Sequence, residues 1–379
     1  MRKSKDIRSR KKLHLDKIHT IVALAQFAIT AILVLVILQM ITMFRYNNDM
    51  IIACTTISYV LAIILMSILA KQLFSWYKSN RNSVIILYAI SSTIIAVNAG
   101  LTLIFVDIIL IHQPTEVRPH SGSVAPTITL FLASVSLSSI LNYAYIITTV
   151  ASFVSFWVST AVILRHYSER LGSTKYWLML STPLVFFLSQ FMPFFVDLFS
   201  AFRQSEPILF SLIYTVIFTL SKPAGGILFG IAFWIVARSL PKNSVVRDYL
   251  IISGFGIILL LVSNQAMILV SFTYPPFGLV TISFVGISSY LILVGIYSSA
   301  ISVSEDINLR KSIKSHVLKE LKLLDSIGIA QMEKEIERKA ISFIRTRDSM
   351  VEETGVSPSL SDDDIKKYLE QVLKEAKKQ

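Results

Sequence analysis

Long apolar segments alternate with short polar gaps along the first 300 residues of the chain. A helix of about 20 apolar residues crosses a hydrocarbon core of about 30 Å. The alternation therefore predicts an all-α fold, a polytopic helical membrane bundle of about eight transmembrane helices. The predicted spans are residues 18–44, 50–70, 83–111, 140–164, 176–199, 208–237, 249–274 and 278–300.

Lysine and arginine cluster in every second gap between these segments. The N-terminal stretch and the gaps after the second, fourth and sixth spans hold three or more basic residues each, whereas the other gaps hold one (Arg45, Arg118 and Arg203) or none. Cytoplasmic loops are enriched in Lys and Arg. We therefore expect a multi-pass protein of the cell (plasma) membrane with both termini in the cytoplasm, which requires an even number of spans.

Composition supports the same class. The chain is 54% hydrophobic and 16% charged, below the roughly 25% charged residues of a soluble domain. The net charge is +12, but residues 303–379 hold 15 basic and 15 acidic residues, so the excess lies in the membrane part and its loops. Membrane lipids with anionic headgroups are the expected partners. Nucleic acid is not, because the basic residues are not interleaved with aromatics on one face.

The chain divides into three parts: a basic cytoplasmic segment (1–17), the transmembrane bundle (18–302) and a cytoplasmic amphipathic tail (303–379). Apolar residues of the tail repeat at helical spacing from Ile313 to Leu324, from Met332 to Phe343 and from Ile365 to Leu373, and Gly328 is expected to interrupt the first two patterns. These apolar stripes must bury against each other, a second copy, the membrane surface or a partner protein.

A stretch before the fourth span has an unusual length. Residues 112–126 are polar and proline-containing, and residues 127–137 are apolar again. The stretch from 127 to 164 is too long for one straight span and short for two. We therefore expect an interfacial or re-entrant segment at residues 127–139.

Lys222 is the only basic residue deep within a predicted span. An ionisable side chain there costs about 2.5–3.5 kcal/mol on insertion scales, so such residues often have functional roles. Pro223 follows directly and disfavours helical backbone at Lys222. With Gly225 and Gly226, it predicts a helix break, a feature tolerated in membranes where it lines a cavity or packs in protein. Gly226 and Gly230 also predict a close helix-packing surface.

Four other polar residues fall at comparable depth by residue count: Asn98, Gln190, Asn264 and Gln265. Together with Lys222 they form a candidate cavity. The alternative is that each hydrogen-bonds a neighbouring helix. Asp107 and Asp197, near the outer ends of their spans, are possible ion-pair partners of Lys222. In the alternative, both face external water and Lys222 extends toward the membrane surface.

No catalytic, metal or cofactor signature is found, so an enzyme is disfavoured. Cys54 is the only cysteine, which excludes an intrachain disulfide and a multi-cysteine metal site. His112, Glu116 and His120 are four apart, but Pro114 and Pro119 oppose a helix between them.

The run from Phe277 to Asp306 contains Ser288-Ser289-Tyr290-Leu291 and Tyr297-Ser298-Ser299-Ala300, and it resembles uncharacterised archaeal multi-span membrane proteins. The layout also resembles the input half of multi-span sensor kinases, although the tail has no kinase core. Two functions remain open. The favoured one is a membrane sensor or adaptor that couples the bundle to a tail that binds a partner or self-associates. The alternative is a transporter or channel for a small polar or anionic solute.

Overall fold

The computed structural model describes residues 15–43, 47–112, 137–165, 168, 172–191, 199–241, 244–265, 275–306, 310 and 324–338. Within these ranges the regular structure is helical and no strand occurs, so the predicted all-α fold is confirmed. Seven helices in them are long and apolar enough to cross a membrane. The protein is therefore an integral, multi-pass membrane protein, in which helices satisfy backbone hydrogen bonds internally.

The long helices follow the apolar segments in order. The first half contains α2 (Leu15–Met43), α3 (Asn48–Ser79), α4 (Ser83–His112) and α6 (Leu137–Leu164). The second half contains α8 (Ser173–Ser189), α10 (Ser200–Ser205), α11 (Pro207–Thr219), α12 (Ser221–Arg238), α13 (Val245–Ser263), α15 (Pro275–Ser283) and α16 (Val285–Glu305).

Three predicted segments extend beyond the described residues. Helix α8 has 17 residues and is not among the seven candidate spans, and the end of the predicted fifth span falls at residues 192–198, outside the description. Helix α13 ends at Ser263, and residues 266–274 of the predicted seventh span are likewise outside it. Of the segment predicted to be re-entrant, residues 127–136 are also outside the description, and residues 137–139 belong to α6.

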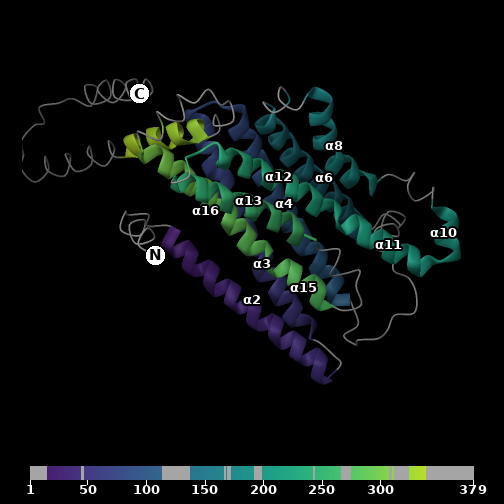
Figure 1. Ribbon diagram of the computed structural model, residues 1–379. Helices are drawn as coiled ribbons and strands as arrows, with labels where there is room; N and C mark the ends of the chain where they lie inside the picture. The colour runs from purple at the N-terminus through teal and green to yellow at the C-terminus, as the bar shows by residue number, and fades with distance from the viewer. Residues whose placement is uncertain are drawn as a thin grey trace, which may run out of the picture.

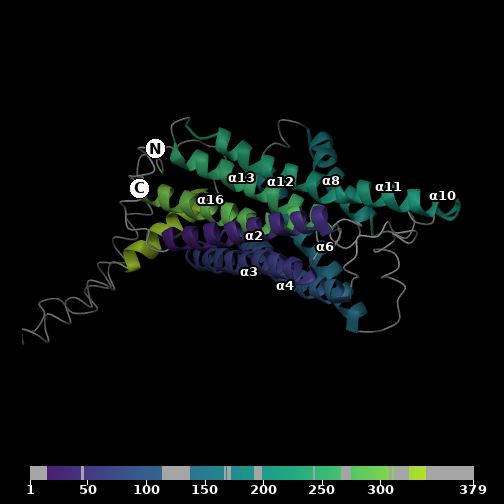
Figure 2. The same ribbon diagram turned by 90° about the horizontal axis from the view of Figure 1, so that it is seen from below.

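Six helices form a closed ring in which each packs on the next: α3, α4, α6, α12, α13 and α16, which returns to α3. Helix α2 lies outside the ring along α3 and α16, at one edge of the bundle (Figures 1 and 2). Helix α8 packs on α12 and α6, and α10 and α11 project from the bundle at the opposite edge (Figure 1).

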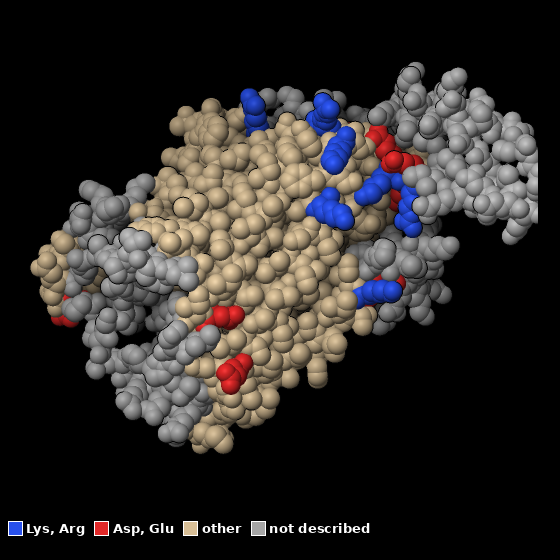
Figure 3. All heavy atoms as spheres, turned by 180° about the vertical axis from the view of Figure 1, so that it is seen from behind, with Lys and Arg blue, Asp and Glu red and all other residues tan. Residues whose placement is uncertain are grey.

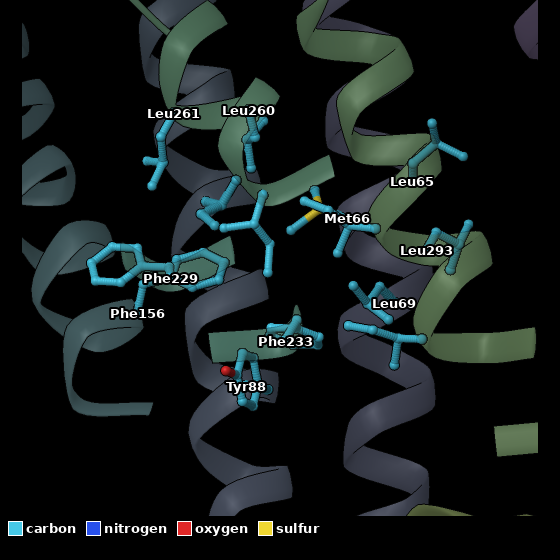
Figure 4. Packing of buried hydrophobic residues seen from close by; sticks show 14 of the residues in the cluster. Leu65, Met66, Leu69, Tyr88, Phe156, Phe229, Phe233, Leu260, Leu261 and Leu293 are labelled. Carbon is cyan, nitrogen blue, oxygen red and sulfur yellow. The ribbon is translucent and has the colours of Figure 1, made fainter. Parts of the chain in front are cut away.

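The ring encloses a core of aromatic and aliphatic side chains (Figure 4). Tyr88 of α4 and Phe233 of α12 meet edge to face with ring centroids 5.7 Å apart. Phe156 of α6 stacks on Phe229 of α12 at 5.9 Å. Lipid tails are as apolar as these side chains, so close packing rather than escape from water holds the helices together.

Glycines bring α12, α13 and α16 into backbone contact. A Cβ atom on Gly230 of α12 would lie 2.7 Å from the carbonyl oxygen of Gly254 on α13. A Cβ atom on Gly295 of α16 would lie 2.6 Å from the carbonyl oxygen of Tyr249 on α13. The small residues of the sixth and eighth spans therefore serve packing inside the bundle, as expected where helix backbones approach closely in a membrane.

The last two helices of the bundle, α15 and α16, are separated by a break at Phe284. Ser58 of α3 bridges that break. Its Oγ donates to the carbonyl oxygen of Ile282 at 2.6 Å and accepts from the backbone N–H of Gly286 at 3.3 Å. The side chain thus supplies hydrogen bonds to backbone groups next to the break, as buried polar groups in a membrane require.

A further helix covers residues 324–338, which we call the docked tail helix, and it lies beside the end of α16 (Figure 1). The prediction that Gly328 interrupts the tail pattern is wrong, because this helix runs through it. Gly328 sits against Val303 of α16, where a Cβ atom would collide. The glycine is therefore explained by close helix packing.

Candidate functional site

The backbone around Lys222 is interrupted between α11 and α12. Helix α11 ends at Thr219, and the N–H of Leu220 donates back to the carbonyl of Ile217 at 3.1 Å. The carbonyl of Leu220 accepts from the N–H of Ala224 in α12 at 3.0 Å, which links the two helices. Pro223 lies in the first turn of α12, where a helix needs no intrahelical N–H donor. The turn therefore accommodates proline without losing a hydrogen bond, and it places Lys222 at the joint of the two helices.

The Lys222 ammonium points into the bundle. Its Nζ donates to the backbone carbonyl oxygen of Asn264 at 3.1 Å, and the side chain is half-buried. Asn264 is the C-terminal cap of α13, and the carbonyl end of a helix carries about half a negative charge. The dipole of α13 therefore partly compensates the positive charge of Lys222.

The side chain of Asn264 continues the contact across the bundle. Its Nδ2 donates to Oδ1 of Asn98 on α4 at 3.3 Å, and its Oδ1 accepts from the hydroxyl of Tyr59 on α3 at 3.3 Å. Asn98 in turn donates from Nδ2 to the hydroxyls of Thr148 at 3.0 Å and Thr149 at 2.9 Å, both on α6. We call these six residues, Tyr59, Asn98, Thr148, Thr149, Lys222 and Asn264, the Lys222 cluster.

Two independent helices give the same depth for this cluster. At a rise of about 1.5 Å per residue, Asn98 lies about 23 Å along α4 from Ser83, and Lys222 lies about 24 Å along α12 from Arg238. Both reference residues belong to the same end of the bundle. In a hydrocarbon core of about 30 Å, the cluster would lie in the half of the membrane away from Ser83 and Arg238.

The structure joins three of the five candidate cavity residues, Lys222, Asn98 and Asn264. Gln265 is buried beside Asn264 and donates its backbone N–H to the carbonyl of Ser263. Gln190 lies elsewhere: its Nε2 donates to the carbonyl of Phe187 at 2.8 Å, and its own carbonyl accepts from the Tyr214 hydroxyl at 2.9 Å. Gln190 therefore links α8 to α11 and does not join the cluster.

Of the two acidic residues predicted as possible ion-pair partners of Lys222, the structure describes Asp107 alone. Asp107 lies about 14 Å further along α4 than Asn98. One of its carboxylate oxygens is buried without a hydrogen-bond partner in the described structure. Asp197 is outside the described residues. Of the other predicted residues, Gly225 packs against Phe153 of α6 and Gly226 against Leu261 of α13, so both serve helix contact next to the break.

Sequence reasoning missed Tyr59, Thr148 and Thr149. Hydroxyl residues are frequent in these spans and mostly bond to their own helix, as Thr102 does to the carbonyl of Asn98 at 2.6 Å. Only the rotation of each helix about its axis decides which hydroxyl reaches a neighbour. The position of Thr148 and Thr149 one turn from the middle of their span gives no such signal.

Blue lysine and arginine side chains gather at one end of the bundle, with some acidic side chains among them (Figure 3). Apart from Lys222 and from Arg203 on α10, the lysines and arginines of the described ranges lie at one end, which we call the basic end. Asp49, Asp107 and Glu206 lie toward the other. The residues of the basic end are Lys17, Lys71, Lys78, Arg81, Arg165, Lys175, Arg238, Arg247, Arg310, Lys334 and Arg338.

The docked tail helix binds to this basic end through several side chains, among them Gln331, Ser326 and Lys334. Gln331 Oε1 accepts from Trp76 Nε1 at 3.0 Å and from Gln72 Nε2 at 3.2 Å, both on α3. Asn82, which precedes α4, donates from Nδ2 to the hydroxyl of Ser326 at 2.6 Å. Leu324 and Ile327 are buried beneath the helix and line a small apolar cavity with core residues of the ring: Leu73, Tyr88, Phe233, Leu250, Ile296 and Ser299.

The described residues contain no group of three histidine, cysteine or acidic side chains suited to a metal ion. Comparison with protein-family models, with curated proteins and with solved structures found no match to this chain. The class of the protein therefore rests on its own fold, a multi-pass helical membrane protein with a polar cluster inside the bundle and a helix docked at its basic end.

Proposed function

We propose that the protein is a membrane sensor or adaptor in which the arrangement of the bundle controls the cytoplasmic tail. The observation that carries this proposal is the docking of residues 324–338 by Gln331 onto Trp76 and Gln72 of α3. The same helix touches Val303 of α16 through Gly328. Its binding surface is thus composed of two different helices, so a shift between α3 and α16 changes how well it fits.

The contacts are of a kind that suits reversible docking. The tail helix buries an apolar stripe of Leu324, Ile327, Ala330 and Met332, and its other contacts are hydrogen bonds at the rim of the bundle. A hydrogen bond typically contributes about 0.5–1.5 kcal/mol net, and fully burying a leucine or isoleucine about 1.5–3 kcal/mol. A modest change in geometry is therefore enough to release the helix and present its stripe to a partner or to a second tail.

The proposal includes the orientation in which the basic end faces the cytoplasm of the cell membrane, because cytoplasmic loops are rich in Lys and Arg. Membrane-impermeant thiol reagents test it on intact cells in a Cys54→Ser background. Cysteine at Asn47, between α2 and α3, is expected to react from outside, and cysteine at Gly172, before α8, only after permeabilisation. The reverse pattern contradicts the orientation.

Coupling is tested by cross-linking the docked tail helix to the bundle. Cysteines at Ser83 and Asp325 flank the Asn82–Ser326 hydrogen bond and leave the bonded residues unchanged. A short bismaleimide is expected to join them in membranes. Asn98→Ala, which disrupts the Lys222 cluster, is expected to change the yield about five-fold or more, the lower range of allosteric coupling.

A cysteine pair at Ser83 and Leu87, one turn apart on α4, controls for reagent access, since its yield does not depend on the tail. An unchanged Ser83–Asp325 yield in Asn98→Ala, with the same yield in the control pair, contradicts coupling between cluster and tail. Failure of the Ser83–Asp325 pair to cross-link in any variant contradicts docking itself.

A second candidate function is transport of a small polar or anionic solute. The observation that favours it is the chain of hydrogen bonds from Lys222 through Asn264 and Asn98 to α6, which links four helices of the bundle. Polar residues that converge on a broken helix are typical of transporter sites. If Lys222→Met folds and leaves the flux of every tested anion into proteoliposomes unchanged, this candidate is wrong.

A further inference from the structure

The Lys222 cluster holds more hydrogen-bond donors than it uses. An ammonium has three N–H donors and an amide NH₂ group has two. Within the described residues, Lys222 uses one donor, to the carbonyl of Asn264, and the Asn264 amide uses one, to Asn98. Asn98 is fully engaged, because its NH₂ group donates to both threonines and its oxygen accepts from Asn264. The surplus donors therefore lie together at Lys222 and Asn264.

The positive charge of the cluster favours the same kind of ligand as its unused donors, an anion. Lys222 is the one ionisable cation among the six residues, and the cluster contains no carboxylate. The carbonyl end of α13 supplies only about half a compensating charge. A cation held in a low-dielectric bundle is stabilised by a nearby anion, and lysine is a common point-charge ligand for phosphate.

We propose that the Lys222 cluster binds an anionic oxygen group, a phosphate or carboxylate, through the ammonium of Lys222 and the free amide N–H of Asn264. The group belongs either to a lipid headgroup or to a small soluble anion. A cation is the wrong ligand at this point, because the unused groups of Lys222 and of the Asn264 amide are hydrogen-bond donors and Lys222 is itself positively charged. This inference names the ligand class for the site that the transport candidate uses, and equilibrium binding tests it separately from flux and from tail docking.

The depth of the cluster is compatible with both sources. Lys222 lies about 24 Å along α12 from Arg238. With Arg238 at one boundary of a hydrocarbon core of about 30 Å, about 6 Å separates Lys222 from the other boundary. A lysine side chain and a lipid headgroup can each bridge part of that distance. Yet Nζ bonds inward to Asn264, which a lysine merely extended toward the membrane surface would not do.

The experiment uses the full chain, purified in a neutral maltoside detergent. Thermal unfolding is followed as sodium phosphate or sodium acetate is titrated against sodium chloride of equal ionic strength, because a ligand that binds the folded state raises the unfolding temperature. Native mass spectrometry of the same protein with added dioleoyl phosphatidylglycerol or dioleoyl phosphatidylcholine measures lipid binding. Lys222→Met is compared with Lys175→Met, an exposed lysine of the basic end.

We expect wild type and Lys175→Met to bind the anionic probe alike, and Lys222→Met to bind it about ten-fold or more weakly, as expected for loss of a charge-assisted hydrogen bond. Stabilisation by phosphate or acetate identifies a soluble anion. Retention of phosphatidylglycerol over phosphatidylcholine, without an effect of the soluble anions, identifies a headgroup.

If Lys222→Met does not fold, Lys222→Arg retains charge and donors and is compared with Asn264→Leu, which removes the second donor. Binding retained in the first and weakened in the second supports the site. The proposal is overturned if wild type binds none of the anionic probes, or if Lys222→Met and Lys222→Arg bind them as wild type does. It is also overturned if the anionic probes bind to Asp197→Asn but not to wild type, since Asp197 would then be the counter-ion of Lys222.

Discussion

The side-chain amide of Asn264 donates a hydrogen bond to Oδ1 of Asn98 at 3.3 Å, joining two asparagines that lie 166 positions apart in the chain. The bond links the C-terminal end of α13 to the middle of α4. Because Asn264 also receives the Lys222 ammonium, these two asparagines connect the broken sixth span with α6. The pair therefore fixes the relative positions of helices that are not neighbours in sequence.

Asn98→Ala is expected to lower the free energy of unfolding by about 1–2 kcal/mol. It removes hydrogen bonds to Thr148, Thr149 and Asn264, and such bonds average about 0.6 kcal/mol in a membrane protein, with a maximum near 1.7. Detergent-induced unfolding measures the change. Thr93→Ala on the same helix is the control, because Thr93 is exposed and bonds to its own helix at Ala89. Equal losses in the two variants would argue against the cluster.

Ser58→Ala is expected to cost about 1–2 kcal/mol of stability. The change leaves the carbonyl of Ile282 and the N–H of Gly286 without their partner beside the break at Phe284. Thr55→Ser is a gentle control on the same buried face, since its hydroxyl bonds to Ile52 within α3. Unfolding titrations of both variants check the prediction, and wild-type stability in Ser58→Ala contradicts it.

Gly230→Ala is expected to destabilise the bundle by about 1–3 kcal/mol, because the new methyl group meets the carbonyl of Gly254 and the side chain of Ile258. Gly100→Ala provides the matched control. A Cβ atom there would find Ile63 at 3.8 Å, an ordinary van der Waals distance. Gly100→Ala is therefore expected to be neutral or stabilising. Unfolding midpoints of the two variants test this, and a midpoint for Gly230→Ala equal to or above that of Gly100→Ala contradicts the prediction.

Docking of the tail helix is expected to strengthen as the pH rises toward 10.5. Burial, with a smaller contribution from Lys71, lowers the pKa of Lys334 from its ordinary value of 10.5, while Glu337 opposes the change. The released helix therefore binds more protons than the docked one between the lowered pKa and 10.5, and the docking free energy grows with pH in that window.

Spin labels at Ser83→Cys and Asp325→Cys in the Cys54→Ser background report the docked fraction at each pH. Lys334→Gln is expected to flatten the dependence in this window. A pH dependence of the same size in Lys334→Gln would assign it to another group.

Hydropathy predicted the helices because a membrane span must be long and apolar, but it misplaced the end of α3. The predicted second span stops at residue 70, whereas α3 continues to Ser79. Polar residues such as Lys71 and Gln72 lower the hydropathy of this stretch, although Leu73 and Trp76 within it are buried. Trp76 stacks on Tyr297 of α16 with ring centroids 6.2 Å apart and bonds to Gln331, contacts that only the tertiary fold creates.

Depth within the predicted spans identified Lys222, Asn98 and Asn264 from the sequence, because a polar residue in the middle of a span needs a hydrogen-bond partner. Depth also selected Gln190, which lies at a similar level, but its side chain bonds back to the carbonyl of Phe187 on its own helix. Residue counts give the height of a side chain and not the direction in which it points. That direction depends on helix packing, so the sequence could not exclude Gln190 or find Tyr59.

The glycine contacts among α12, α13 and α16 limit the motions open to these helices. With Gly230 against Gly254 and Gly295 against Tyr249, no layer of side chains separates the backbones. Rolling one helix past another would drive main-chain atoms together, and packed interiors compress very little. We therefore expect the three helices to tilt or slide as one rigid unit. Lys222 lies on one outer helix of this unit and Val303 on the other, so we expect a displacement at one to move the other.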